Sequence, residues 1–199
     1  HEHRRQRQMC IRDRPTINKI VSDGGSVIIL SHLGRPKNGP EQSFSLIHLT
    51  DHLEKITGRK VLFANDCIGE EAEILSQKLN PGEILLLENV RFHKEETKGD
   101  HSFAKQLADL GDCYVNDAFG TAHRAHSSTT HIAAYFTGEN KMCGLLMEAE
   151  IKSAKKVMEE TQRPFTAIVG GAKVSDKVLI VENLMKTADH IIIGGGMAY

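Results

Sequence analysis

The chain has 199 residues, with 25 Lys and Arg, 26 Asp and Glu, and a formal net charge of −1. Hydrophobic residues make up 40% and charged residues 26%, which excludes a disordered, collagenous or disulfide-scaffold protein. No apolar run approaches the ~18 residues of a membrane span, and the near-zero charge argues against general nucleic-acid or membrane-surface binding. We therefore expect one or two globular domains.

The first 14 residues differ in composition from the rest. They contain five arginines, one Glu and one Asp, a local charge of +3, which leaves −4 for the remainder. They show no apolar periodicity and no hydrophobic run of signal-peptide length. Two interpretations are open, a basic arm that binds anions or a disordered or non-native end, and the second is favoured.

From residue 15 onwards, short apolar runs alternate with stretches of helical periodicity. Strands are predicted to start at residues 27, 61, 84, 113, 166 and 190, with helices predicted over 46–56, 69–79, 103–110, 146–160 and 174–187. Strands that are apolar on consecutive residues are typical of a parallel sheet covered on both faces. The pattern predicts an α/β fold, a three-layer α/β/α lobe of the Rossmann-like type, followed by the beginning of a second similar lobe.

The widest gap between predicted strands, from 113 to 166, contains the long charged helix. This helix is the best candidate for a connection between two lobes. We therefore expect a first lobe over 15–145, an interdomain helix over 146–162 and a second lobe beginning at 163 and running to 199.

The four cysteines are scattered, at Cys10, Cys67, Cys113 and Cys143, and none forms a Cys-x-x-Cys pair. This spacing excludes a zinc knuckle or a thioredoxin-type motif. Cys113 lies in an apolar run and is predicted to be a buried free thiol. Free thiols favour a reducing compartment, so the cytoplasm is expected.

Basic side chains follow three predicted strands of the first lobe. His32 and Arg35 flank Gly34 after the strand at 27, Arg91 follows the strand at 84, and Arg124 follows the strand at 113. Ligands bind beyond the carboxyl ends of strands in such sheets, and arginine matches phosphate or carboxylate oxygens with two donors. Glycine lets the backbone approach a ligand closely. The pattern favours an anionic ligand over unrelated surface salt bridges.

The second lobe carries two glycine-rich turns. Gly170-Gly171-Ala172-Lys173 follows one strand and opens a helix, an arrangement that suits a phosphate at the helix N-terminus. It is not a Walker A loop. Lys177 by itself is interpreted as a solvated surface lysine, whereas Lys173, directly after the glycines, is not. Gly194-Gly195-Gly196 follows the next strand and suits the edge of a nucleotide, although the dinucleotide fingerprint is absent.

Several other polar residues are interpreted without a catalytic role. His48 and His52 lie opposite a leucine stripe and are predicted to face solvent. A metal site among the histidines of residues 123–131 is disfavoured because Arg124 opposes a cation, and no metal-binding residue is assigned. Asp66 and Asp117 are expected to make local hydrogen bonds.

Five motifs occur together in one order: SHLGRP, ENVRF, VNDAFGTAHRAHSS, GGAKVSDK and GGGMAY. Together they resemble the phosphoglycerate kinase family, from about Pro15 to Tyr199. The resemblance implies a two-lobed monomer that transfers a phosphoryl group reversibly between 1,3-bisphosphoglycerate with ADP and 3-phosphoglycerate with ATP, with Mg²⁺ accompanying the nucleotide. The first lobe would bind the phosphoglycerate and the second the nucleotide.

The resemblance also implies site residues. Those that would bind the phosphoglycerate are His32, Leu33, Gly34, Arg35, Arg91 and Arg124. Those that would bind the nucleotide are Gly171, Ala172, Lys173, Lys177, Gly195 and Gly196. Lys173 and Arg35 would be catalytic, by stabilising charge on the transferring group. Phosphoryl transfer requires positioning and positive charge rather than a nucleophile, which agrees with these residue types.

The chain also departs from the family pattern. The family's initial Arg-x-Asp-x-Asn segment is not matched, Met9 stands where an arginine is expected, and the main ligand of Mg²⁺ is not among these residues. We therefore expect an internal fragment that is inactive by itself. The alternative is a non-catalytic module that binds phosphoglycerate or another anion.

Overall fold

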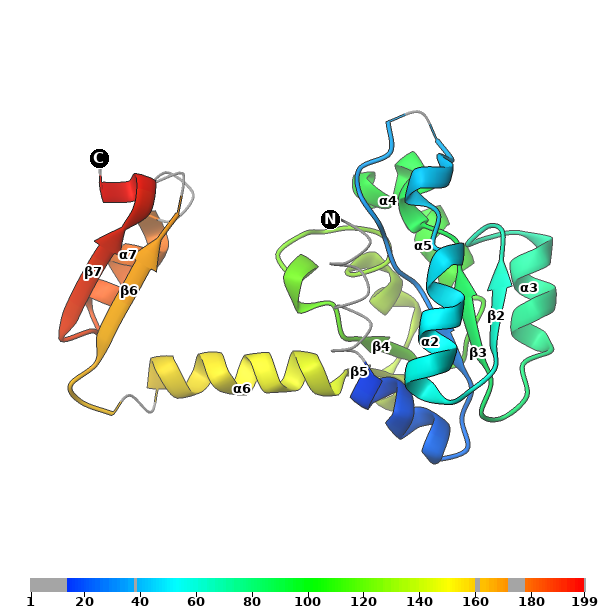
Figure 1. The fold of residues 1–199 in the computed structure, drawn as a ribbon, viewed down its shortest axis with the longest axis horizontal. Coiled ribbons are helices and arrows are strands. Elements are labelled where there is room, and N and C mark those ends of the chain that lie inside the picture. The colour runs from blue at the N-terminus through cyan, green and yellow to red at the C-terminus, as the bar shows by residue number, and fades with distance from the viewer. Residues whose placement is uncertain (1–13, 38, 160–161, 172–177, 199) are drawn as a thin grey trace. The chain divides into compact units, whose positions relative to one another are not determined.

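The computed structural model describes residues 14–37, 39–159, 162–171 and 178–198. The chain divides into two compact units between residues 149 and 150 (Figure 1). Among the described residues, no helix has the length and apolar character needed to cross a membrane.

A three-stranded parallel sheet forms the centre of the first unit. Its strands are β1 (Val27–Ile29), β2 (Val61–Ala64) and β3 (Ile84–Leu87), in the order β1-β3-β2. Ile84 of β3 pairs with both Val27 and Val61. All four side chains of β3 are buried, as expected for a central parallel strand covered on both faces.

Alternate residues of β3 face two different helical layers. Leu85 and Leu87 pack in a cluster that includes α5 (His101–Ala108), with α3 (Glu70–Gln77) contributing to the same side. Leu86 packs with Leu49 and Leu53 near α2 (Thr50–Thr57), and Ile84 packs against a helix over residues 14–22. The two layers confirm the expected three-layer α/β/α arrangement. Each fully buried leucine stabilises the fold by about 1.5–3 kcal/mol.

The short helix α4 (Lys94–Lys98) and the helix over 14–22 were not among the predicted elements. Ile17 and Val21 of the latter are buried against the sheet, at a helical spacing that the sequence does contain. The helix α2 ends at Gly58, whose φ of 67° is the left-handed conformation that glycine adopts most easily.

A second pair of parallel strands, β4 (Tyr114–Asn116) and β5 (Lys141–Cys143), follows α5. Short 3₁₀ turns lie between them, at η4 (Phe119–Thr121), η5 (His131–Tyr135) and η6 (Gly138–Asn140). All three residues of β5 are exposed, so the apolar pattern that identifies buried strands could not predict it. The prediction for Cys113 was wrong: this thiol is exposed, and Cys67 is the buried one.

The helix α6 (Leu145–Glu159) begins in the first unit and continues past the division at residue 149. The second unit pairs β6 (Thr166–Gly170) with β7 (His190–Gly194) in parallel, with Gly170 opposite Gly194. The helix α7 (Val178–Met185) connects these strands, and η7 (Gly195–Ala198) follows β7.

Candidate anion-binding site

The loop after β1 and the turn after β3 are joined by one buried side chain, Asn89. Its Nδ2 donates to the backbone oxygens of Leu33 (2.8 Å) and Phe44 (2.9 Å), and its Oδ1 accepts from the backbone N–H of Arg91 (3.0 Å). Asn89 is 1% exposed, and its bond to Leu33 is buried while the bonds to Phe44 and Arg91 are partly buried. It therefore fixes the turn η3 (Val90–Phe92), which carries Arg91, against the loop that carries His32.

Arg91 adds a direct contact to the same loop, since its Nη1 donates to the backbone oxygen of Gly34 at 2.8 Å. Gly34 has a φ of +64°, and a Cβ there would lie 2.3 Å from Cε1 of Phe44. The loop therefore requires glycine because of both its backbone conformation and the neighbouring ring. The Leu33 side chain is 4% exposed and packs in the core with Leu46, so it supports the loop from below.

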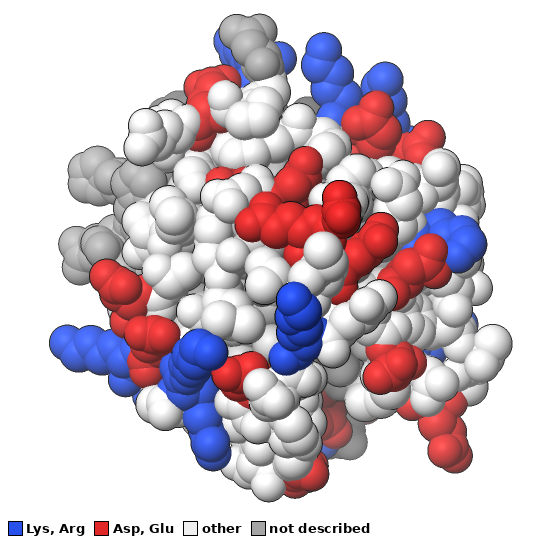
Figure 2. All heavy atoms as spheres, turned by 90° about the vertical axis from the view of Figure 1, so that its right-hand side faces the viewer, with Lys and Arg blue, Asp and Glu red and all other residues white. Residues whose placement is uncertain are grey.

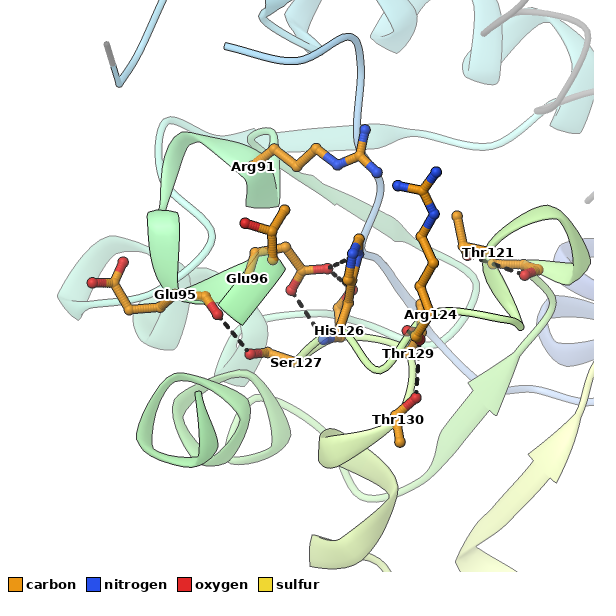
Figure 3. A network of polar contacts seen from close by, with 12 residues as sticks. Arg91, Glu95, Glu96, Thr121, Arg124, His126, Ser127, Thr129 and Thr130 are labelled. Atoms are coloured by element: carbon orange, nitrogen blue, oxygen red, sulfur yellow. Dashed lines mark hydrogen bonds and ion pairs between the residues drawn. The ribbon is translucent and has the colours of Figure 1, made fainter. Parts of the chain in front are cut away.

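Five basic side chains form one group, which we call the basic patch: His32, Arg35, Arg91, Arg124 and His126. Burial and the charges of Arg91, His126 and Arg124 lower the pKa of His32 to about 4. Burial together with the charges of Arg124 and Arg35 also lowers the pKa of Arg91. Positive charges lower one another's pKa only when they lie close together. The basic side chains that follow three different strands therefore converge, as Figure 3 shows for Arg91 and Arg124.

One buried donor in the basic patch is unsatisfied. Arg91 Nε is buried, and it finds no hydrogen-bond partner among the described residues. A buried donor without an acceptor costs about 1–3 kcal/mol, so the patch favours any ligand that supplies an oxygen there. An anion would supply the acceptor and offset the repulsion between the cations.

Glu96 of α4 supplies the negative charge beside the patch (Figure 3). It is 2% exposed, and its carboxylate accepts from the backbone N–H of Ser128 at 3.0 Å and from Ser128 Oγ at 2.7 Å. Its Oε1 also lies 3.7 Å from His126 Nδ1. Burial lowers the pKa of His126, while the charge of Glu96 raises it. Glu96 therefore holds the loop of residues 124–130 on α4 and partly neutralises the patch.

Further bonds hold the same loop. Ser127 Oγ donates to the backbone oxygens of Glu95 (3.1 Å) and Asp100 (3.0 Å). Thr129 and Thr130 each donate a hydroxyl to the backbone oxygen of Arg124, at 3.1 and 3.2 Å. The backbone that presents Arg124 is thus fixed by side chains within its own loop and by the α4–α5 segment.

The two glycine turns of the second unit lie side by side. A Cβ added to Gly195, whose φ is +69°, would lie 3.5 Å from the backbone N and O of Gly171. The turns therefore form one backbone surface at the carboxyl ends of β6 and β7, with Gly196 following in η7. The other residues expected at this site, Ala172, Lys173 and Lys177, lie outside the described residues.

The remaining polar residues gave mixed outcomes. His48 is exposed as predicted, but the prediction for His52 was wrong: its Nε2 is buried, without a hydrogen-bond partner among the described residues. Asp66 makes the expected local bond, accepting from the N–H of Cys67. Asp117 instead makes long-range bonds, accepting from Thr16 Oγ1 (2.5 Å) and the N–H of Met147 (2.8 Å).

Asn89 and Glu96 were not identified from the sequence. Asn89 lies in the ENVRF motif and Glu96 follows that motif by four residues. Their roles depend on hydrogen bonds to Leu33 and Ser128, which are more than 30 residues away in the sequence. An amide close to a strand end is the one sequence signal for Asn89, whereas Glu96 lies inside α4, nine residues after β3, and carries no such signal.

The fold and the site define a Rossmann-like α/β protein. Cationic side chains follow the strands of its first unit, and two adjacent glycine turns follow the strands of its second unit. A family model described as phosphoglycerate kinase matches residues 5–199. The chain therefore belongs to the phosphoglycerate kinase family. The family match begins at residue 5, whereas the motif resemblance begins ten residues later, at about Pro15.

Similar proteins carry the same name. The chain is 48% identical over 208 residues to the phosphoglycerate kinase of Porphyromonas gingivalis, covering 93% of this chain and 50% of that protein. It is 50% identical over 184 residues to the phosphoglycerate kinase of Moorella thermoacetica, covering 92% of this chain and 46% of that protein. It therefore spans about half the length of these curated relatives.

Solved structures of the same name are also similar. The phosphoglycerate kinase of Coxiella burnetii aligns with a TM-score of 0.80 at 40% identity, over 94% of this chain and 46% of that one. The phosphoglycerate kinase of Pyrococcus horikoshii aligns with a TM-score of 0.83 at 30% identity, over 95% of this chain and 48% of that one.

Proposed function

We propose that the chain is part of an enzyme that transfers a phosphoryl group reversibly between 1,3-bisphosphoglycerate with ADP and 3-phosphoglycerate with ATP. Family membership supports the reaction. The observation that carries the proposal is the basic patch, where converging cations include a buried Arg91 Nε without a partner among the described residues. A phosphoglycerate bears both a phosphate and a carboxylate, which suit such a group of donors.

The proposed substrate contacts follow from the loops that carry them. Arg91 and Arg124 would bind anionic oxygens through their guanidinium groups, and the more exposed Arg35 would reach the transferring phosphate. His32 is neutral near pH 7 because its pKa is about 4, and a bound anion would raise that pKa. Leu33 and Gly34 would contribute backbone shape, because the Leu33 side chain is in the core.

The nucleotide would bind on the glycine surface of the second unit, through Gly171, Ala172, Lys173, Lys177, Gly195 and Gly196. The adjacent positions of Gly171 and Gly195 support this, since two backbones without side chains let phosphates approach closely. Mg²⁺ would enter as part of the nucleotide substrate. Lys173 and Arg35 would stabilise charge on the transferring group, and no protein nucleophile is required. A cytoplasmic monomer is proposed for the enzyme.

The test is calorimetric titration of the purified chain with 3-phosphoglycerate and, separately, with inorganic phosphate. We expect 3-phosphoglycerate to bind more tightly than phosphate, and Arg91→Gln to weaken it at least tenfold. Arg59→Gln is the matched control, because Arg59 is an exposed arginine after α2. Absence of 3-phosphoglycerate binding to the wild-type chain would refute the proposal.

The reaction is proposed for a protein with the length of the relatives, and we expect the 199 residues by themselves to bind without turnover. A turnover assay with ATP and 3-phosphoglycerate on the longer protein separates the two candidate functions. Binding without turnover there would favour a non-catalytic anion-binding module.

A further inference from the structure

A second group of polar side chains lies at the ends of neighbouring strands and shares no residue with the basic patch. Asp66 and Cys67 follow β2, and His93 follows η3 after β3; Ala64 and Leu87 pair at these strand ends. The carboxylate oxygen, the thiol sulfur and the imidazole nitrogen all lie within 4.8 Å of one another. Within the described part of the chain, this is the one such group of three or more His, Cys, Asp or Glu side chains.

The donor set is that of a borderline-soft cation. It offers one sulfur, one nitrogen and one oxygen, a combination that suits Zn²⁺ and related transition metals and suits Mg²⁺ or Ca²⁺ poorly. In a tetrahedral zinc site with bonds of ~2.0–2.3 Å, ligand atoms lie ~3.3–3.6 Å apart. His93 Nε2 and Asp66 Oδ1 are now 2.7 Å apart. They would have to separate by about 0.6 Å to admit a cation between them.

The site is rigid on one side and open on the other. Cys67 is the rigid part, because it is fully buried and packs in the core cluster that includes Ala64 and Phe103. The side chains of His93 and Asp66 are 26% and 51% exposed, so these two can move and a cation can enter from solvent. Burial and the charge of Asp66 raise the pKa of the Cys67 thiol, so a cation has to displace the thiol proton in order to bind.

The surrounding surface also favours a cation. The first turn of α3 begins three residues after Cys67 and carries Glu70, Glu71 and Glu73. Figure 2 shows acidic side chains gathered on the side of the first unit where α3 lies. A local excess of negative charge raises the concentration of cations near the opening.

We propose that Asp66, Cys67 and His93 bind a divalent transition-metal cation of the zinc type, with a fourth position open to water. Binding displaces the thiol proton to solvent and replaces the present Asp66–His93 hydrogen bond. The cation would tie the end of β2 to the segment that follows η3, two residues beyond Arg91.

The probe is Co²⁺, because a cobalt–thiolate bond gives a charge-transfer absorption that oxygen and nitrogen ligands do not. The background is a variant in which Cys10, Cys113 and Cys143 are all serine, so that Cys67 is its one thiol. We expect the absorption to appear on addition of Co²⁺ and to disappear when Zn²⁺ is added. His93→Gln in this background should reduce Co²⁺ affinity at least tenfold, whereas His101→Gln, at an exposed histidine elsewhere, should not.

Two outcomes would overturn the proposal: no thiolate absorption in the triple-serine background, or the same affinity after His93→Gln. The first would leave Asp66 and His93 as an ordinary surface hydrogen bond. If the triple-serine variant does not fold, as judged by circular dichroism, the wild-type chain is compared with Cys67→Ser and Asp66→Asn. Zn²⁺ should then raise the melting temperature of the wild type and leave both variants unchanged, and equal shifts would count against the site.

Discussion

Replacing Glu96 with glutamine tests whether one buried carboxylate holds the loop that presents Arg124 and His126. The carboxylate is 2% exposed and accepts two bonds from Ser128. Glutamine has nearly the same shape but keeps one acceptor oxygen and carries no charge. One Ser128 donor would then face an amide NH₂ group, and the neighbouring cations would lose their negative partner.

The expected cost is about 2–4 kcal/mol in the free energy of unfolding, from one unsatisfied buried donor and one lost counter-charge. Glu95→Gln is the matched control. It makes the same chemical change one residue away, at an exposed side chain that points away from the network in Figure 3. A surface change of this kind costs at most about 0.5 kcal/mol.

The assay is urea unfolding followed by circular dichroism, combined with an NMR titration of His126. Because the charge of Glu96 raises the pKa of His126, Glu96→Gln should lower that pKa further. The reasoning would be refuted if the two glutamine variants were equally stable, or if the pKa of His126 did not fall. A purely steric role for Glu96 would change the stability and leave the pKa in place.

Three further predictions concern the loops of the patch. The pKa of His32 is about 4 in the folded chain and 6.5 in the unfolded chain, so the unfolded chain takes up the proton first as the pH falls. The free energy of unfolding should therefore decrease by up to about 3 kcal/mol between pH 6.5 and pH 4. In urea titrations, His32→Gln should reduce this dependence of the unfolding free energy on pH. Asn89→Ala should cost about 3 kcal/mol, measured the same way, because one buried and two partly buried bonds are lost; a loss under 1 kcal/mol would contradict its bridging role. Gly34→Ala should lower the melting temperature more than Gly39→Ala, because both have positive φ but only Gly34 would also clash with Phe44; equal shifts would count against the clash.

The sequence indicates the central sheet well because its strands are apolar on consecutive residues. Leu85 and Leu86 face opposite layers, yet both are buried, so the run of apolar residues alone marks the strand. The strand β5 was not predicted because its residues are all exposed, so it has no run of buried apolar residues. It is defined by its backbone pairing with β4.

The candidate site divides along a similar line. The arginines of the patch could be predicted because each lies in the loop that follows a strand, between four and eight residues after the strand ends. The roles of Asn89 and Glu96 could not, because each is defined by hydrogen bonds to segments 32–56 residues away. His52 was misjudged because helical periodicity identifies the most apolar face of a helix and does not show what else covers the opposite one.

The hydrogen bonds around Thr16 have a consequence for the order in which the first unit can fold. Its hydroxyl donates to Asp117, 101 residues later, and accepts from the N–H of Leu145, 129 residues later. Closing chain segments of this length is costly in entropy and delays the contacts that depend on it. During synthesis, the helix over residues 14–22 therefore cannot complete its polar contacts until the start of α6 has left the ribosome, although the central sheet has all three strands once β3 has emerged.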